Sequence, residues 1–136
     1  MDPEYLLKAL NNNNNEYVFE LTSQKIIKIK QKILETIPLN KNQKKVLEEK
    51  LKNYIYIDSV NKLKLGSYVR WLNKDEEELN KGAFLSSVYI SNDNIHIVLK
   101  NFNKSLFTLN FYDVILFQKL SQQENVLLEA LDILKK

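Results

Sequence analysis

The spacing of apolar residues changes near residue 58, from a helical period to strict alternation. Upstream of this point, isoleucines recur at steps of three and four residues: Ile26, Ile29, Ile33 and Ile37. This spacing places one apolar stripe along a helix, which we expect to run from residues 22–23 to about 37. Such a stripe has to be buried against the rest of the chain or against a partner.

A second helix is predicted downstream of Pro38. Asn40 and Gln43, three residues apart, have the pattern of a capping box, and the helix is expected to continue to about Tyr56. The short connection between the two helices makes them an antiparallel hairpin. At the start of the chain, residues 2–4 indicate a third helix, and the asparagine tract 11–15 is typical of a flexible spacer. Residues 16–21 fit either a strand or the approach to the next helix.

Alternating apolar and polar residues dominate the chain from residue 65 onward, and they predict five strands: 67–72, 83–90, 94–100, 105–111 and 113–118. Asn92 and Asp93 indicate a tight turn, because both residue types tolerate left-handed backbone angles. Short strands of this number and spacing fit a small SH3-like barrel. Ser121 with Glu124 predicts a capping box for a closing helix, which we expect to pack on the barrel end or on the helical hairpin.

The predicted architecture is therefore α+β. It combines an N-terminal helical arm and hairpin over residues 1–62 with a five-stranded SH3-like β-barrel and its C-terminal helix over residues 63–136.

Charge is distributed unevenly between these two parts. Residues 23–52 carry nine lysines and three glutamates, whereas residues 65–136 are close to neutral. A lysine-rich helical face, together with the single arginine, is a candidate nucleic-acid surface. Its candidate contacts are Lys25, Lys28, Lys32, Lys41, Lys44, Lys45 and Arg70. The alternative is an ordinary solvated face in a chain whose abundant lysine, asparagine and isoleucine match AT-rich codons.

The residue types that most enzymes need are scarce. The chain has no cysteine, one histidine (His96) and two glycines, so it offers no thiolate metal site and no glycine-rich phosphate loop. The acidic run 75–78 lacks the ligand spacing of a calcium loop. We therefore expect no enzymatic activity, no cofactor and no bound metal. No apolar run is long enough to span a membrane and no signal peptide is evident, so an intracellular protein is expected.

Three segments resemble small uncharacterised SH3-like proteins of nucleocytoplasmic large DNA viruses. They are Gly66-x-Tyr68-Val69-Arg70-Trp71, Gly82-Ala83-Phe84-Leu85 after an acidic insert, and Val114-Ile115-Leu116-Phe117. The resemblance covers residues 65–118, with one glycine in the second segment where those proteins tend to have two. It implies a particle- or genome-associated protein, located in the virion or the host cytoplasm, and it carries over no activity or site.

Three functions follow from these patterns. The first is a non-catalytic structural or interaction protein that assembles with itself or with another protein, through residues that include Ile26, Ile29, Ile33, Ile37 and Tyr68. The second is a nucleic-acid-binding module that uses the lysines of residues 23–52. The third is a peptide-reading SH3-like domain, which requires an exposed aromatic groove near Tyr68.

Overall fold

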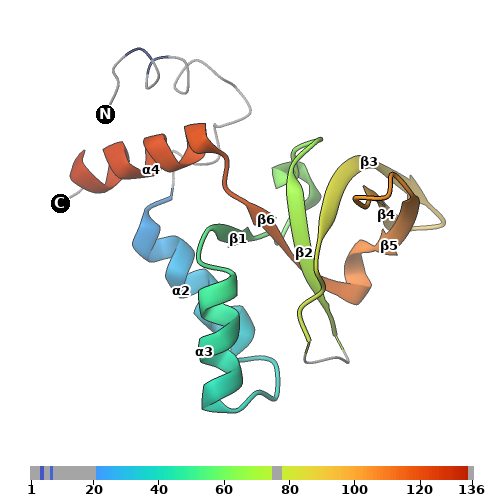
Figure 1. Ribbon diagram of the computed structural model, residues 1–136, viewed down its shortest axis with the longest axis horizontal. Helices are drawn as coiled ribbons and strands as arrows, with labels where there is room; N and C mark the ends of the chain where they lie inside the picture. Colours follow the sequence, from blue (N-terminus) through green and yellow to red (C-terminus); the bar gives the residue numbers. More distant parts are fainter. Residues whose placement is uncertain (1–3, 5–6, 8–20, 75–77, 135–136) are drawn as a thin grey trace.

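The computed structural model describes residues 4, 7, 21–74 and 78–134, and this part of the chain is α+β (Figure 1). Its helices are α2 (Ser23–Leu34), α3 (Lys41–Lys50) and α4 (Gln122–Leu134), with two short 3-10 turns, η2 (Val60–Lys62) and η3 (Phe111–Asp113). Its strands are β1 (Tyr54–Tyr56), β2 (Tyr68–Asn73), β3 (Ala83–Ser91), β4 (Asn94–Lys100), β5 (Leu106–Asn110) and β6 (Val114–Lys119). The expected features at residues 2–4, 11–15, 16–20 and 75–77 lie outside the described residues, apart from Glu4.

The strands form one antiparallel sheet in the order β1-β6-β2-β3-β4-β5. All five predicted strands are present, and the tight turn is confirmed by positive φ angles at Asn92 and Asp93. The five-stranded closed barrel is not confirmed, because the sheet has six strands and stays open, with β1 and β5 at its edges. Figure 1 shows the three helices gathered on one side of the molecule and β3, β4 and β5 curling on the other.

The sixth strand, β1, lies where the sequence predicted helix. Helix α3 ends at Lys50 with Leu51 as its cap, and Tyr54–Tyr56 pairs antiparallel with the end of β6. The prediction of a helix to Tyr56 was therefore wrong. Aromatic and β-branched side chains favour a strand, and here they pack on both faces of the sheet.

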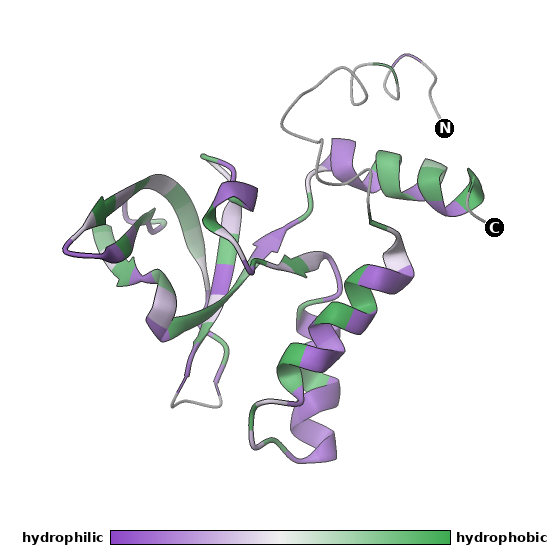
Figure 2. Cartoon of the chain, turned by 180° about the vertical axis from the view of Figure 1, so that it is seen from behind, coloured by the Kyte–Doolittle hydropathy of each residue, from purple (hydrophilic) through white to green (hydrophobic). Residues whose placement is uncertain are grey.

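The helix starts agree with the sequence patterns. Asn40 and Gln43 form both hydrogen bonds of the capping box of α3, and Ser121 and Glu124 do the same for α4. Helix α2 ends at Leu34, one turn earlier than predicted, and a tighter turn carries the chain on to Pro38. In Figure 2, hydrophobic and hydrophilic stretches alternate along α2 and α3, as amphipathic helices require.

The sheet has a core on each of its two faces. We define the inner face as the one that carries Val69 and Trp71, which pack with residues of β3, β4 and α4. The outer face carries Leu72 and Phe117, which pack against the α2–α3 hairpin. Successive residues of β2 therefore point to opposite faces of the sheet, as the sequence predicted for Val69 and Trp71 against Tyr68 and Arg70.

Both cores contain residues from each side of the boundary expected at residue 62. The inner core includes Ile26 and Ile57, and the outer core includes Leu34 and Leu51. Helix α4 contributes Leu127 to the inner core and also meets α2, where Asp132 accepts hydrogen bonds from Ser23. Within the described residues, no helix is long and apolar enough to cross a membrane.

Candidate nucleic-acid interface

A row of cross-strand neighbours runs over the outer face of the sheet beyond the area that the helical hairpin covers. Tyr68 of β2 pairs with Phe84 of β3, and Phe84 pairs with Lys100 of β4. Lys119 of β6 lies one step past the last β2–β6 pair and so falls across from Tyr68. Direct partners in an antiparallel pair point to the same face, with Cβ atoms about 4.5–5.5 Å apart. The row therefore places two neighbouring aromatic side chains, Tyr68 and Phe84, between two lysines.

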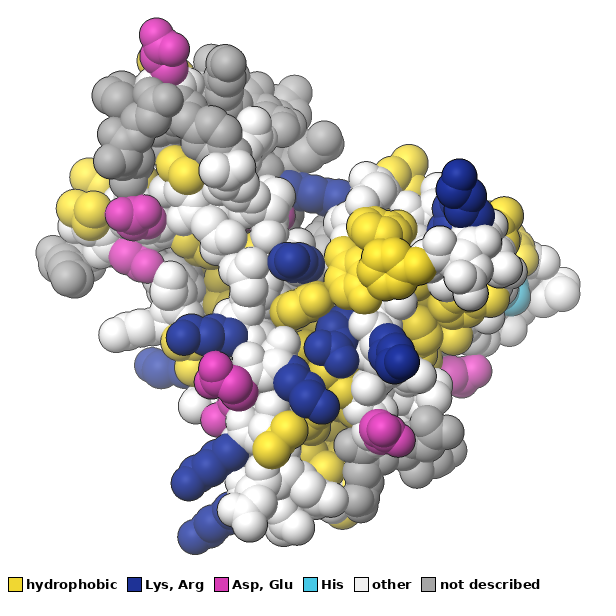
Figure 3. Space-filling view, viewed as in Figure 1, with side chains coloured by type: hydrophobic (Ala, Val, Ile, Leu, Met, Phe, Trp, Pro, Cys, Tyr) yellow, Lys and Arg dark blue, Asp and Glu magenta, His cyan; other side chains and the backbone are white. Residues whose placement is uncertain are grey.

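The charge of this sheet has one sign. The six strands contain no aspartate or glutamate, and their Lys and Arg residues are Arg70, Lys100 and Lys119. All three lie on the outer face, since Arg70 pairs with Phe117 and Lys119 follows it in the alternation of β6. In Figure 3, Lys and Arg side chains border a hydrophobic patch on the half of the molecule that contains the strands. The outer face therefore combines apolar surface with positive charge.

Three aromatic rings meet on this face, and we call Tyr68, Phe84 and Phe102 the aromatic cluster. The ring centroids lie 5.1 Å apart for Tyr68–Phe84, 5.8 Å for Phe84–Phe102 and 6.0 Å for Tyr68–Phe102. Phe102 is 75% exposed and Phe84 is 40% exposed. The cluster is thus a surface feature, separate from the two cores except where Tyr68 packs against the outer one.

The loop that carries Phe102 is held in shape by its own hydrogen bonds. The side-chain oxygen of Asn101 accepts from the backbone N–H groups of Asn103 and Ser105, and Lys104 has a positive φ angle. These bonds close the β4–β5 hairpin that the sequence predicted at this point. Phe102 is therefore presented to solvent by a structured loop.

Tyr68 is fixed by its hydroxyl and by a glycine. The Tyr68 hydroxyl donates to the backbone oxygen of Lys81 at 2.7 Å. Gly82 has φ +108°, and a Cβ atom at this position would lie 2.7 Å from the Tyr68 ring. Only glycine satisfies both the backbone angle and the close approach of the ring.

Arg70 lies beside the aromatic cluster. Its Nε donates to the backbone oxygen of Asn80 at 3.0 Å, which orients the guanidinium. Burial raises the pKa of the Tyr54 hydroxyl, while the charge of Arg70 opposes this shift and Tyr68 adds to it. Tyr54 pairs with Lys119 of β6, so its side chain lies on the outer face together with those of Tyr68 and Arg70.

The lysines predicted from the sequence lie on the helices, away from this row. Lys25, Lys28 and Lys32 are exposed on α2, and on α3 the side chains of Lys41 and Lys45 are exposed while that of Lys44 is half-buried. The groove between α2 and α3 carries both signs of charge, because Glu48 and Glu49 line it together with Lys45 and Lys52. Of the predicted contacts, the outer face of the sheet holds only Arg70.

One helical lysine has a structural role. Lys30 is 7% exposed, and its Nζ donates to the backbone oxygens of Leu51 at 2.8 Å and Lys52 at 3.4 Å. Burial lowers the pKa of its amine, and the charge of Glu48 partly offsets this effect. Lys30 therefore binds carbonyls at the end of α3, which have no partner within the helix.

The isoleucine stripe predicted over residues 26–37 is largely buried inside the folded chain. Ile26 and Ile37 are buried, and Ile33 is half-buried against the outer core. Ile29 is 43% exposed, and its neighbour Ile27 is 49% exposed. The stripe predicted as an assembly surface thus leaves a smaller apolar area at the solvent.

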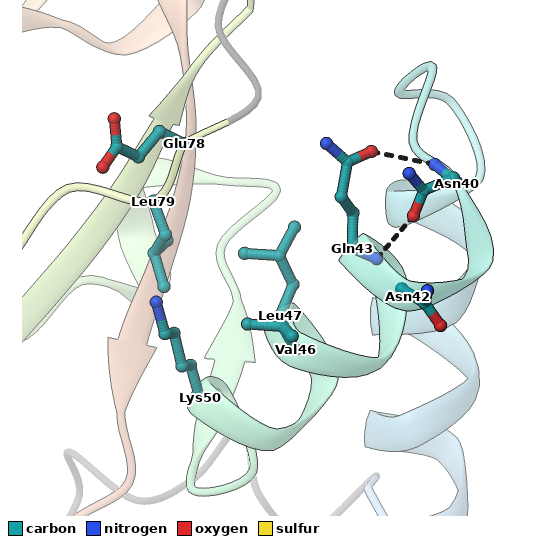
Figure 4. A pocket seen from close by; sticks show the side chains of 8 residues that line it. All are labelled: Asn40, Asn42, Gln43, Val46, Leu47, Lys50, Glu78 and Leu79. Carbon is teal, nitrogen blue, oxygen red and sulfur yellow. Dashed lines mark hydrogen bonds between the residues drawn. The ribbon is translucent and has the colours of Figure 1, made fainter.

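An open hollow of about 660 Å³ lies between α3 and the connection that follows β2 (Figure 4). It is lined by Asn40, Asn42, Gln43, Val46, Leu47, Lys50, Glu78 and Leu79. Asn40 and Gln43 are engaged in the capping box that Figure 4 draws with dashed lines. The charged residues of the lining are Lys50 and Glu78, one of each sign.

The chain's histidine and its acids form no metal centre in the described part of the structure, where no group of three or more His, Asp or Glu residues could hold an ion. His96 lies on β4 and stacks on Tyr89, with ring centroids 4.7 Å apart. His96 alternates with the buried Ile97, so it lies on the outer face of the sheet.

A buried carboxyl group lies on the opposite side of the sheet. Glu124 is 1% exposed, and burial raises its pKa to about 7 although the backbone hydrogen bond from Ser121 opposes the shift. The Nζ of Lys64 lies 3.3 Å from Glu124 Oε2, and burial lowers the pKa of this amine to about 8. This pair joins the start of α4 to the segment before β2.

Comparison with known proteins gives no relative: no family model, no curated protein and no solved structure matches the chain. The resemblance to viral SH3-like proteins therefore stays a prediction.

Sequence reasoning identified Tyr68 and Arg70 but missed Phe102, Lys100 and Lys119. One signal for Phe102 was present, since a large aromatic residue in a short hairpin loop is exposed unless the loop folds back. The two lysines had no local signal, because each ends a strand and acquires neighbours only through the pairing of the sheet.

Proposed function

We propose that the chain is a non-catalytic nucleic-acid-binding module that contacts phosphates with the outer face of its sheet. The observation that supports this proposal is the row of Lys119, Tyr68, Phe84 and Lys100 across strands that contain no acidic residue. It modifies the sequence-based hypothesis, which used the lysines of the helices.

The physical basis is the release of counterions. A polyanion that binds Arg70, Lys100 and Lys119 gives up the cations condensed on its phosphates, and affinity then falls with salt. Arg70 adds a planar group suited to phosphate oxygens, and its contact with Asn80 lowers the entropy lost on binding. Acidic residues on the same face would cancel this attraction, and the strands have none.

The test is a titration of the full chain with labelled oligonucleotides, single-stranded and duplex, at low and moderate salt. We expect the logarithm of the binding constant to fall by about 0.7–0.9 for each phosphate neutralised per tenfold rise in salt. Combined substitution of Arg70, Lys100 and Lys119 by glutamine is expected to flatten this dependence. Binding that ignores salt, or a triple variant that binds like the natural chain, contradicts the proposal.

Self-association is a second candidate, and the exposed side chains of Ile27 and Ile29 on α2 favour it. A homo-oligomer or a complex with another protein, such as the particle component that the viral resemblance implies, would cover these residues. Light scattering coupled to size exclusion tests this candidate: we expect an oligomer that Ile27→Glu with Ile29→Glu dissociates. A monomer at all concentrations contradicts it.

A further inference from the structure

The aromatic cluster has properties that phosphate contacts alone do not require. Phe84 and Phe102 are exposed on the outer face while both cores are complete without them. Exposed apolar rings gathered in one place mark an interaction site more often than scattered single residues do. The rings lie beside the cations of the same face, since Phe84 is the direct cross-strand partner of Lys100.

Neighbouring rings flanked by cations match the chemistry of one kind of polyanion. Each nucleotide of a single strand carries a flat base and a charged phosphate, and base stacking on aromatic side chains is typical of proteins that bind single strands. A duplex keeps its bases stacked inside, so it could use only the cations of this surface. A sheet with exposed aromatic residues and flanking positive charge is thus suited to unpaired bases.

The cluster is also organised before a ligand arrives. Tyr68 is anchored to Lys81, Gly82 admits its ring, and the loop of Phe102 is closed by the side chain of Asn101. Rings already in position lose little conformational entropy on binding.

We infer that the outer face binds single-stranded nucleic acid, with bases stacked on Phe84 and Phe102 and phosphates held by Lys100, Lys119 and Arg70. This inference rests on the proposed function and names its ligand. The sequence tolerance expected of such a site is broad, because every base has a face that can stack.

The decisive experiment compares one labelled oligonucleotide, free and as a duplex with its complement, against the full chain and three variants at the same salt. Phe102→Ala is expected to weaken single-strand binding about 5- to 150-fold, the effect of losing one stacked base, and to leave duplex binding nearly unchanged. Phe102→Leu keeps an apolar side chain without a ring and is expected to lose nearly as much. Ile90→Ala, at a side chain that is 76% exposed on the same strand as Phe84, serves as the matched control and is expected to bind normally.

Each outcome decides between the two proposals. Equal binding of single strand and duplex, with no effect of Phe102→Ala, overturns the inference and leaves phosphate binding by the sheet intact. A variant Phe102→Leu that binds like the natural chain also overturns it, since an apolar contact then suffices. No binding to either nucleic acid overturns both proposals, and in that case binding of an acidic peptide by the same surface supports the peptide-reading alternative. Thermal unfolding of each variant checks that the fold is kept.

Discussion

The helical hairpin and the outer face of the sheet are both positively charged, but they acquire this charge in different ways. On the hairpin, Lys25, Lys28 and Lys32 are close in the sequence, and the α2–α3 groove beside them mixes lysine with glutamate. On the sheet, cations from three strands meet aromatic side chains and no acid. The comparison shows that lysines close in the sequence can lie beside acids in the fold, whereas cations from separate strands can be brought together beside exposed rings.

The largest expected effect is on nucleic-acid affinity, and it tests whether the cations of the sheet contribute more than those of the hairpin. Substitution of Arg70, Lys100 and Lys119 by glutamine is expected to weaken nucleic-acid binding at least about tenfold at low salt. The matched variant Lys25→Gln, Lys28→Gln, Lys32→Gln loses the same charge from α2 and is expected to change affinity by less than about threefold. Titration at equal salt measures both. An equal loss in the two variants means that only the net charge of the protein matters.

Lys30→Met tests whether the buried lysine of the hairpin has a structural role that the exposed lysines lack. It leaves the carbonyl oxygens of Leu51 and Lys52 without the amine that binds them, and the free energy of unfolding is expected to fall by about 1–3 kcal/mol. Lys28→Met, at an exposed position of the same helix, is expected to change it by less than about 0.5 kcal/mol. Urea denaturation gives both values. A neutral Lys30→Met would remove the structural role assigned to this lysine.

The two glycines offer a test within the sheet. Both Gly66 and Gly82 have positive φ angles, so alanine at either is expected to destabilise the fold by about 1–2 kcal/mol. At Gly66 a Cβ atom would meet no atom within 4 Å, whereas at Gly82 it would displace the Tyr68 ring. Only Gly82→Ala is therefore expected to weaken nucleic-acid binding as well, in titrations run below the unfolding temperature of both variants. Equal nucleic-acid binding by the two variants would mean that the position of the Tyr68 ring does not matter for the site.

The smallest expected effect concerns pH and the inner side of the sheet. The pKa of Glu124 rises from 4.5 to about 7, so the folded chain retains a proton that the unfolded chain releases in this range. The free energy of unfolding contributed by this group therefore falls as the pH rises from about 4.5 to 7.

Glu124→Gln removes this titration and keeps a residue that can serve in the capping box. We expect it to flatten the pH dependence of unfolding between about pH 5 and pH 8, measured by urea denaturation at both values. Glu129→Gln, at an exposed position of the same helix, is the control and is expected to leave the pH profile unchanged. A profile that keeps its slope in Glu124→Gln assigns the dependence to another group.

The sequence by itself determined the local elements of this protein. The capping boxes at Asn40 and Ser121, the turn at Asn92 and the alternation of Val69 and Trp71 depend on residues that are neighbours in the chain, so their patterns are visible in the sequence. The same reasoning separated the helical half from the strand-rich half. It failed at Tyr54–Tyr56, where pairing with β6 decides between helix and strand.

Only the tertiary structure brought together the rings and cations of the proposed binding surface. Lys119, Tyr68, Phe84 and Lys100 come from four strands, and strand register alone brings them into one row. The same holds for the predicted isoleucine stripe, since Ile26 of α2 and Ile37 beyond its end are buried in cores that include distant strands. A spacing pattern predicts which side chains are buried and which are exposed. The residues that a buried side chain contacts depend on long-range packing, which the pattern does not contain.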